Sequence, residues 1–319
     1  MSKHFPLIIA IVIIISPSIA SAQPQTDNYI EIWHCSSAIQ NSEFGKYLVS
    51  VGDQNQDGYD DILVSAWNDE VVYFYFGGNP MDTIPDLIFD EPHQSHFGYL
   101  PENCRDLNGD GFIDFSISAD VNWEEYAKIY VYFGGPDLDT VADLIMFPDS
   151  GVYQGEFGKH NDIGDFNGDG FQDLVVGDSR YQLMDAINGK IYVYYGGMEM
   201  NSICDWSITA EYNNIHDLAH VLSSNGDVNG DGFDDILTLG WYPDNPTQIG
   251  WLLFSGGSEP DTIPDWIITG DDVPGLMKPR GLIQPDINNN SFDEIIIASS
   301  APGTIDAYIF KGGNFINTQ

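Results

Sequence analysis

The chain has 319 residues, of which 49 are Asp or Glu and only 10 are Lys or Arg, so its formal net charge is −39. Such an excess of negative charge argues against a nucleic-acid or anionic-lipid partner, because too few cations are present to neutralise phosphates. Hydrophobic residues make up 43% of the chain, which is enough for a packed core and excludes a disordered acidic tail. We therefore expect a globular protein without a nucleic-acid partner.

The first 22 residues have the pattern of a secretory signal peptide. Lys3 and His4 precede an apolar run over residues 7–15, and residues 20–22, Ala-Ser-Ala, form a small-residue cleavage site. This apolar run is too short to cross a bilayer, which needs about 20 residues. The sequence therefore predicts export to the periplasm, the cell surface or the medium, no membrane insertion, and one mature domain over residues 23–319.

A nine-residue pattern, D-x-N-x-D-G-x-x-D, recurs along the whole mature chain. Its five copies begin at Asp53, Asp106, Asp165, Asp227 and Asp286, which are 53, 59, 62 and 59 residues apart. Such a period is typical of stacked supersecondary units. A Phe-Gly pair precedes each of the first three copies, and Ala219-His220 stands at this place in the fourth.

Each unit is expected to contain four short strands in a fixed order. The first precedes the nine-residue pattern, and a β-branched second strand follows it, as at 62–64, 174–176 and 295–297. The third strands alternate aromatic and aliphatic residues and run into Gly-Gly pairs; they are predicted at 71–76, 129–133, 191–195, 251–254 and 307–310. A fourth strand follows, as at 87–89 and 266–268. Four strands per unit without an amphipathic helix predict an all-β fold, the β-propeller.

The two ends of the chain indicate the number of blades. The fifth unit stops near residues 317–318, just before its fourth strand, and residues 29–33 resemble that strand. Pairing the N-terminal and C-terminal segments would close the ring and remove its exposed edges. We therefore expect five four-stranded blades; part of a larger six- or seven-bladed ring is the alternative.

Each copy of the pattern has the composition of a calcium loop. Oxygen-bearing side chains at positions 1, 3 and 5 can converge on one hard cation, because Gly at position 6 lets the backbone turn sharply. Position 7 offers its carbonyl oxygen, which leaves its aromatic side chain free to enter the core, and Asp at position 9 closes the shell. The loops contain no His or Cys, which disfavours zinc. The predicted Ca²⁺ ligands are Asp53, Asn55, Asp57, Tyr59 and Asp61; Asp106, Asn108, Asp110, Phe112 and Asp114; Asp165, Asn167, Asp169, Phe171 and Asp173; and Asp227, Asn229, Asp231, Phe233 and Asp235.

The fifth copy is degenerate, with Asn290 in place of Asp and Ser291 in place of Gly. We expect it to form a weak or empty site, whose candidate ligands are Asp286, Asn288, Asn290, Phe292 and Glu294. The alternative for all five copies is a set of Asx turns, in which Asp and Asn only hydrogen-bond the backbone. That alternative suits one loop, but it explains poorly four copies in which all five special positions agree.

The Phe-Gly pair, the nine-residue loop and a small-residue strand end such as residues 300–302 together resemble the FG-GAP repeat of integrin α-subunit propellers and of bacterial relatives with VCBS-type repeats. The resemblance extends from Phe44 to the C-terminus. It implies a propeller in which calcium is held in the hairpin between the first two strands of a blade. That implication falls on Asp53 to Asp61 and on the matching positions of the next three units.

The loops between second and third strands should lie at the opposite end from the calcium hairpins, because successive hairpins alternate ends. Aromatic residues recur there, and they are candidates for a sugar or peptide platform; they are Trp67, Trp123, Tyr181 and Trp241. The alternative is that each ring packs over its own blade. No nucleophile motif is present. We therefore expect a secreted, calcium-binding adhesion module for a glycan or a protein rather than an enzyme; the alternative is a calcium-dependent enzyme, lyase- or phytase-like, acting on a polysaccharide or a phosphorylated substrate.

Overall fold

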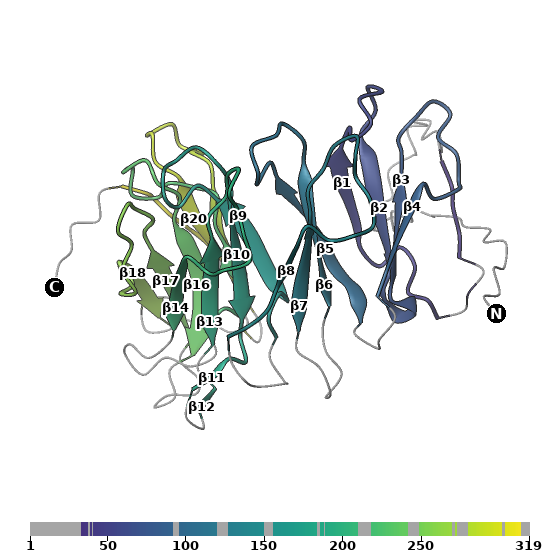
Figure 1. Ribbon diagram of the computed structural model, residues 1–319. Coiled ribbons are helices and arrows are strands. Elements are labelled where there is room, and N and C mark those ends of the chain that lie inside the picture. Colours follow the sequence, from purple (N-terminus) through teal and green to yellow (C-terminus); the bar gives the residue numbers. More distant parts are fainter. Residues whose placement is uncertain are drawn as a thin grey trace, which may run out of the picture.

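The computed structural model describes residues 33–37, 39, 41–91, 96–119, 127–149, 156–183, 186–187, 189–209, 218–241, 249–269, 272, 280–301 and 304–313. They form five antiparallel sheets of three or four strands, one for each repeat, which follow one another along the chain, and one small two-stranded hairpin (Figure 1). The predicted all-β fold with five blades is therefore confirmed. Among these residues the only helix is the 3-10 turn η1 (Trp67–Asp69), and none is long and apolar enough to cross a membrane.

Neighbouring strands of each blade are also neighbours along the chain. Blade 1 contains β1 (Leu48–Gly52), β2 (Asp61–Ala66), β3 (Val71–Tyr75) and β4 (Leu87–Asp90). Blade 2 contains β5 (Phe97–Arg105), β6 (Asp114–Ala119), β7 (Lys128–Tyr132) and β8 (Leu144–Met146). Blade 3 contains β9 (His160–Gly164), β10 (Asp173–Asp178), β13 (Lys190–Tyr194) and β14 (Trp206–Thr209), with the small hairpin β11 (Gln182–Leu183) and β12 (Ala186–Ile187) inserted before β13. Blade 4 contains β15 (Leu222–Ser223), β16 (Ile236–Trp241), β17 (Ile249–Phe254) and β18 (Trp266–Thr269). Blade 5 has three strands within the described residues, β19 (Arg280–Gln284), β20 (Glu294–Ala301) and β21 (Thr304–Phe310).

The core lies between the blades. Side chains of a strand alternate between the two faces of its sheet, and a blade with a neighbour on each side buries both faces. This explains why the third strands of blades 2 and 3 are apolar or aromatic after their first lysine: β13 is buried at every residue, and β7 is buried at all but the first. Each of the first four blades also contributes one buried residue of its fourth strand to a cluster with the next blade; these residues are Phe89, Met146, Ile208 and Ile268.

Residues 33–35 occupy the corresponding place on blade 1. Phe89 of β4 packs on blade 2, with its ring centroid 4.8 Å from that of Tyr132. Tyr75 is the equivalent of Tyr132 in blade 1, and the Trp33 ring lies 5.3 Å from it. Cys35 is buried in the same cluster, and the Trp33 indole N–H donates to the carbonyl oxygen of Asp82. This segment therefore covers blade 1 as the fourth strand of a preceding blade would.

Contacts between strands of successive blades join blades 1 and 2, 2 and 3, 3 and 4, and 4 and 5. Within the described ranges no contact of similar extent joins blade 5 to blade 1. The segments expected to pair and close the ring, residues 29–32 and 314–319, lie outside the described residues. Closure by these segments therefore stays a prediction.

Candidate functional site

The five nine-residue loops all join the first strand of a blade to its second strand. They lie together at one end of the blades, and the hairpin β11–β12 lies at the other end (Figure 1). The two ends therefore differ as expected: one carries the candidate calcium loops, and the other carries the loops between second and third strands.

Within each loop, the polar side chains turn inward and hold the backbone. In the second loop, the two carboxylate oxygens of Asp106 accept the N–H groups of Asp110 at 3.0 Å and Gly111 at 2.9 Å. The Asn108 side-chain oxygen accepts the Asp110 N–H at 2.9 Å, and Asp110 accepts the N–H of Phe112 at 2.9 Å. Gly111 has φ +93°, which only glycine adopts readily. The first, third and fourth loops repeat these bonds.

The Asp at position 9 has a structural role that the sequence did not reveal. It is fully buried in all of the first four loops, as Asp61, Asp114, Asp173 and Asp235. One oxygen accepts the N–H of position 2, and the other accepts the first N–H of the Gly-Gly pair that follows the third strand. Burial raises the pKa of Asp114 and of Asp173 to about 7 and that of Asp235 to about 8. Each of these residues thus ties its loop to the far end of the third strand.

The donor set of the first four loops fits calcium. Positions 1, 3 and 5 supply carboxylate and amide oxygens, which are the hard ligands that Ca²⁺ takes, and each oxygen that accepts one N–H keeps a second lone pair. In the described ranges, no group of three or more His, Cys, Asp or Glu side chains is arranged to hold a metal ion. The loops place only two carboxylates beside an asparagine, and the third carboxylate faces the backbone. The hydrogen bonds of the Asx-turn alternative are present, so calcium at these loops stays a prediction.

Backbone bonds connect each loop to the next blade. The second glycine of a Gly-Gly pair donates its N–H to the position-2 carbonyl of the preceding loop: Gly197 to Leu107 at 2.6 Å, Gly257 to Phe166 at 2.8 Å and Gly313 to Val228 at 2.9 Å. In the first blade the side-chain oxygen of Gln54 takes the place of that carbonyl and accepts the N–H of Gly135 at 2.6 Å. The loops therefore form one connected layer rather than five separate turns.

The aromatic residues at position 7 do not enter the core as the sequence suggested. Tyr59 is 46% exposed, and its counterparts in the other loops are half-buried. The Phe171 ring lies so close to Gly109 of the preceding loop that a Cβ there would overlap it. Position 2 enters the core instead, since Leu107 and Phe166 are fully buried. Only the three-dimensional stacking of the loops decides which of the two positions faces inward.

The fifth loop keeps the turn but changes the donors around it. Asp286 accepts the N–H groups of Asn290 and Ser291 at 2.9 and 2.7 Å, as position 1 does in the other loops. Glu294 stands at position 9, and its longer side chain reaches the amide groups of Asn288 and Asn290. Two amide N–H donors thus face a carboxylate where a cation would need oxygens. Asn290 also replaces a carboxylate, so this loop offers a cation less negative charge than the first four, in each of which a single Asn amide donates to the position-5 carboxylate.

The end opposite the loops carries an aromatic cluster between blades 1 and 2. The Trp67 ring lies 5.3 Å from that of His96 and 6.0 Å from that of Tyr99, both edge-on, and Tyr47 lies 5.5 Å from Tyr99. The Trp67 indole N–H is buried and has no hydrogen-bond partner. Trp67 therefore packs on the neighbouring blade, whereas the alternative placed each ring over its own blade.

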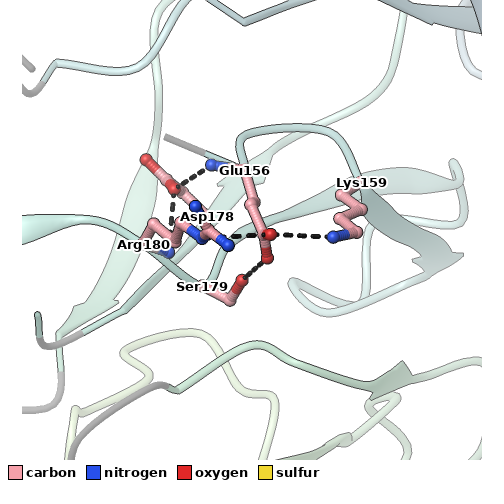
Figure 2. A network of polar contacts seen from close by, with 5 residues as sticks. All are labelled: Glu156, Lys159, Asp178, Ser179 and Arg180. Carbon is pink, nitrogen blue, oxygen red and sulfur yellow. Dashed lines mark hydrogen bonds and ion pairs between the residues drawn. The ribbon is translucent and has the colours of Figure 1, made fainter. Parts of the chain in front are cut away.

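Blade 3 carries a charged network at the same end (Figure 2). Glu156 is 9% exposed and binds Lys159 at 2.7 Å and Arg180 at 3.1 Å, and it accepts the Ser179 hydroxyl. Asp178 is fully buried; one of its oxygens accepts the N–H groups of Glu156 and Arg180, and the other has no partner. Burial, then the nearby Glu156 carboxylate, raises the Asp178 pKa to about 6.

Of the four predicted platform aromatics, the structure describes the side chains of Trp67 and Tyr181, which lie beside different blades. Tyr181 is half-buried beside blade 3, with the Lys190 ammonium 5.2 Å from its ring centroid. Trp123 lies outside the described residues, and Trp241 is the last residue of β16. A ligand role for these residues stays a prediction.

The first strands of blades 2 and 3, β5 and β9, carry Arg105 and His160. Arg105 at the end of β5 donates to the side-chain oxygens of Gln172 at 3.3 Å and Asn225 at 3.1 Å, and so links blades 2, 3 and 4. Burial, then Lys159 and His220, lowers the His160 pKa to about 4, which keeps this imidazole neutral. These groups serve packing between blades in the described structure.

The strand order of the sheets, the sequence repeat and the geometry of the loops together define a β-propeller built from repeated units. Residues 157–194, which contain most of blade 3, match the FG-GAP repeat family. The chain is 28% identical to integrin alpha-5 of Xenopus laevis over 173 residues, which are 50% of this chain and 16% of that protein. It is 36% identical to integrin alpha-PS3 of Drosophila melanogaster over 113 residues, 32% of this chain and 10% of that protein. The resemblance to FG-GAP repeats of integrin α chains is thus confirmed.

A different relative is phosphatidylinositol-glycan-specific phospholipase D of Rattus norvegicus. It is 25% identical over 193 residues, which are 56% of this chain and 19% of that protein. The chain spans less than a fifth of the length of each of these curated relatives. The activities and partners of the whole relatives are therefore not transferred to it directly.

Proposed function

We propose that this chain is an exported, calcium-stabilised propeller that acts as an extracellular binding or adhesion module. The FG-GAP match and the similarity to integrin α chains support this role. The signal-peptide pattern of residues 1–22 supports export, and residues 23–319 form the mature domain in this proposal. Its ligand is an extracellular glycan or protein.

In this proposal calcium is held by the first four loops. In the first loop, Asp53, Asn55 and Asp57 supply side-chain oxygens and Tyr59 its carbonyl oxygen. Asp61 completes the set through a second lone pair on one of its oxygens, each of which already accepts one backbone N–H, from Gln54 or from Gly77. When bound, the ion neutralises carboxylates that otherwise repel one another, and it therefore stabilises the layer of connected loops.

The proposed ligand-binding face rests on one observation, the aromatic cluster of Tyr47, Trp67, His96 and Tyr99. It gathers four rings from two blades at the end opposite the calcium loops. Aromatic rings offer large apolar contact area to a sugar ring or a side chain, and hydroxyl and imidazole groups beside them fix its orientation.

A glycan array probed with the mature protein in calcium, and again in EGTA, tests this proposal. We expect a set of bound glycans that is lost with Trp67→Ala and kept with Tyr59→Ala, since Tyr59 is a half-exposed aromatic at the opposite end. Thermal unfolding of both variants checks that the fold is intact. A glycan bound equally by both variants would place the ligand elsewhere, and a blank array in calcium would leave a protein ligand.

An enzyme is the second candidate, and the match to a phospholipase D supports it. Such an enzyme would act on a phosphorylated substrate or a polysaccharide with the help of calcium. Release of inorganic phosphate from phytate, and of unsaturated products from polyuronates, would establish this activity. Neither product is expected if the chain is a binding module.

A further inference from the structure

We propose that the calcium-loop end carries a second docking surface, which takes a lysine- and arginine-rich polypeptide. It consists of the loops between the third and fourth strands of blades 1 to 4, here called the rim loops. Their residues are 82–86, 139–143, 201–205 and 261–265. This inference goes beyond the proposed function, whose ligand face is at the other end of the blades.

Each rim loop holds one aliphatic side chain out in solvent. The four residues stand at the same place in their blades, and they are Ile84, Val141, Ile203 and Ile263. Their exposed fractions are 72, 72, 74 and 38%. A single exposed isoleucine needs no explanation. An exposed aliphatic residue at the same position of four diverged repeats does need one. A polar residue at this position would cost the core nothing, yet each of the four repeats has an aliphatic one.

The aliphatic side chains are not exposed because the rim loops lack structure. In blade 1, Asp82 accepts the N–H of Ile84 at 2.8 Å, and Asp86 accepts the N–H of Phe76 at 2.8 Å while its own N–H donates to Phe74 at 2.9 Å. The same three bonds recur in the rim loops of blades 2, 3 and 4. The backbone therefore fixes each aliphatic side chain in an outward position, and its partner meets a preorganised surface.

The chemistry beside each aliphatic group indicates the occupant. Asp82 and Asp86 flank Ile84, both exposed, and the same pairs flank Val141 and Ile263; blade 3 has Asn201 in place of the first Asp. A lysine or arginine side chain combines an apolar stem with a terminal cation, so its stem packs on the aliphatic group while its head reaches the carboxylate. The net charge of −39 attracts such a polypeptide and repels a second copy of this face or an anionic membrane.

Binding of a fluorescein-labelled peptide of about 20 lysines, followed by fluorescence anisotropy at saturating calcium, tests the surface. The decisive variant is Ile84→Ser/Val141→Ser/Ile203→Ser/Ile263→Ser, which keeps every charge. We expect it to bind the peptide about tenfold more weakly than the unchanged chain, because the stems lose their apolar contacts. The control is Leu48→Ser, which removes an aliphatic side chain that is 47% exposed at the start of β1, at the opposite end of the blade. It should bind as the unchanged chain does.

The salt dependence separates this surface from unspecific charge attraction. Attraction between exposed charges weakens as salt rises, whereas apolar contact does not, so the difference between chain and variant should persist at 0.5 M salt. Equal affinities of the chain and the fourfold variant would overturn the proposal, as would absence of peptide binding. Sedimentation without peptide tests whether the surface instead binds a second copy of the chain. If the unchanged chain self-associates and the fourfold variant does not, the proposal of a basic polypeptide partner is overturned. A glycan array without bound glycans would not affect this test, because the peptide binds at the other end of the blades.

Discussion

The contact of the Gly-Gly pairs with the calcium loops predicts a sharp contrast between two adjacent glycines. Gly77 donates its N–H to the buried carboxylate of Asp61 at 2.7 Å. A Cβ at Gly77 would overlap the carbonyl oxygen of Asp60 and lie 2.7 Å from the Tyr59 Cβ. Gly77→Ala must therefore push the third strand away from its loop, and the hydrogen bond to Asp61 is lost with it.

The magnitude follows from two effects. Forcing an extra methyl group into a packed site costs about 1 to 3 kcal/mol. A buried acceptor left without its donor costs about 1 to 3 kcal/mol more. We therefore expect Gly77→Ala to lower the free energy of unfolding by about 2 to 6 kcal/mol, a large share of the 5 to 15 kcal/mol that is typical of a domain.

Urea unfolding at saturating calcium, followed by tryptophan fluorescence, measures this loss. The matched control is Gly78→Ala, because a Cβ at Gly78 would lie 3.4 Å from its nearest neighbour, the carbonyl oxygen of Pro80. This control should change the free energy of unfolding by no more than about 1 kcal/mol. Equal urea midpoints for the two variants would refute the reasoning, since the hairpin would then accommodate a methyl group at either glycine.

Three further predictions follow from the loops and from blade 3. Excess EGTA should lower the melting temperature, because each site at a hundredfold excess of calcium over its Kd adds about 2.7 kcal/mol; an unchanged melting temperature would contradict calcium binding. Isothermal titration should find four calcium ions per chain, the same number in Asp286→Asn, and a fifth in Asn290→Asp/Ser291→Gly; a fifth ion in the unchanged chain would show that the last loop binds after all. The Asp178 pKa of about 6 lies above its ordinary value of 3.8, so the folded state holds this proton more tightly and loses stability as the pH rises through 6. Asp178→Asn should therefore gain about 2 to 3 kcal/mol relative to the unchanged chain between pH 4 and pH 7.5, measured by urea midpoints, whereas a difference independent of pH would exclude this ionisation as the cause.

The repeat made the fold predictable, because a period near 59 residues with one β-branched and one aromatic strand per unit leaves few architectures. The third strands of blades 1, 2 and 3 begin within one residue of the predicted starts of 71, 129 and 191, whereas β17 and β21 begin at 249 and 304, earlier than the predicted 251 and 307. The turn chemistry of positions 1 to 6 was also predictable, since it depends on side chains within a few residues of one another.

The partners of position 9 were not predictable from the sequence. Asp61 bonds to Gly77, which is 16 residues away, and that contact exists only because the third strand returns to the loop. The same holds for the position-7 rings of blades 3, 4 and 5, Phe171, Phe233 and Phe292, which each lie against a glycine of the preceding blade. The sequence pattern showed that Gly-Gly pairs recur, but their function depends on which backbone lies against them.

The bonds between one loop and the next Gly-Gly pair also bear on how such a chain can lengthen. Blades 2, 3 and 4 each carry an acceptor, the carbonyl of position 2, and a donor, the second glycine of the pair, and both face a neighbouring blade rather than the blade itself. A tandem duplication of one unit therefore adds a copy that already fits on both sides. Ring size in such proteins can change by a whole blade in one genetic event, without a new interface having to evolve first.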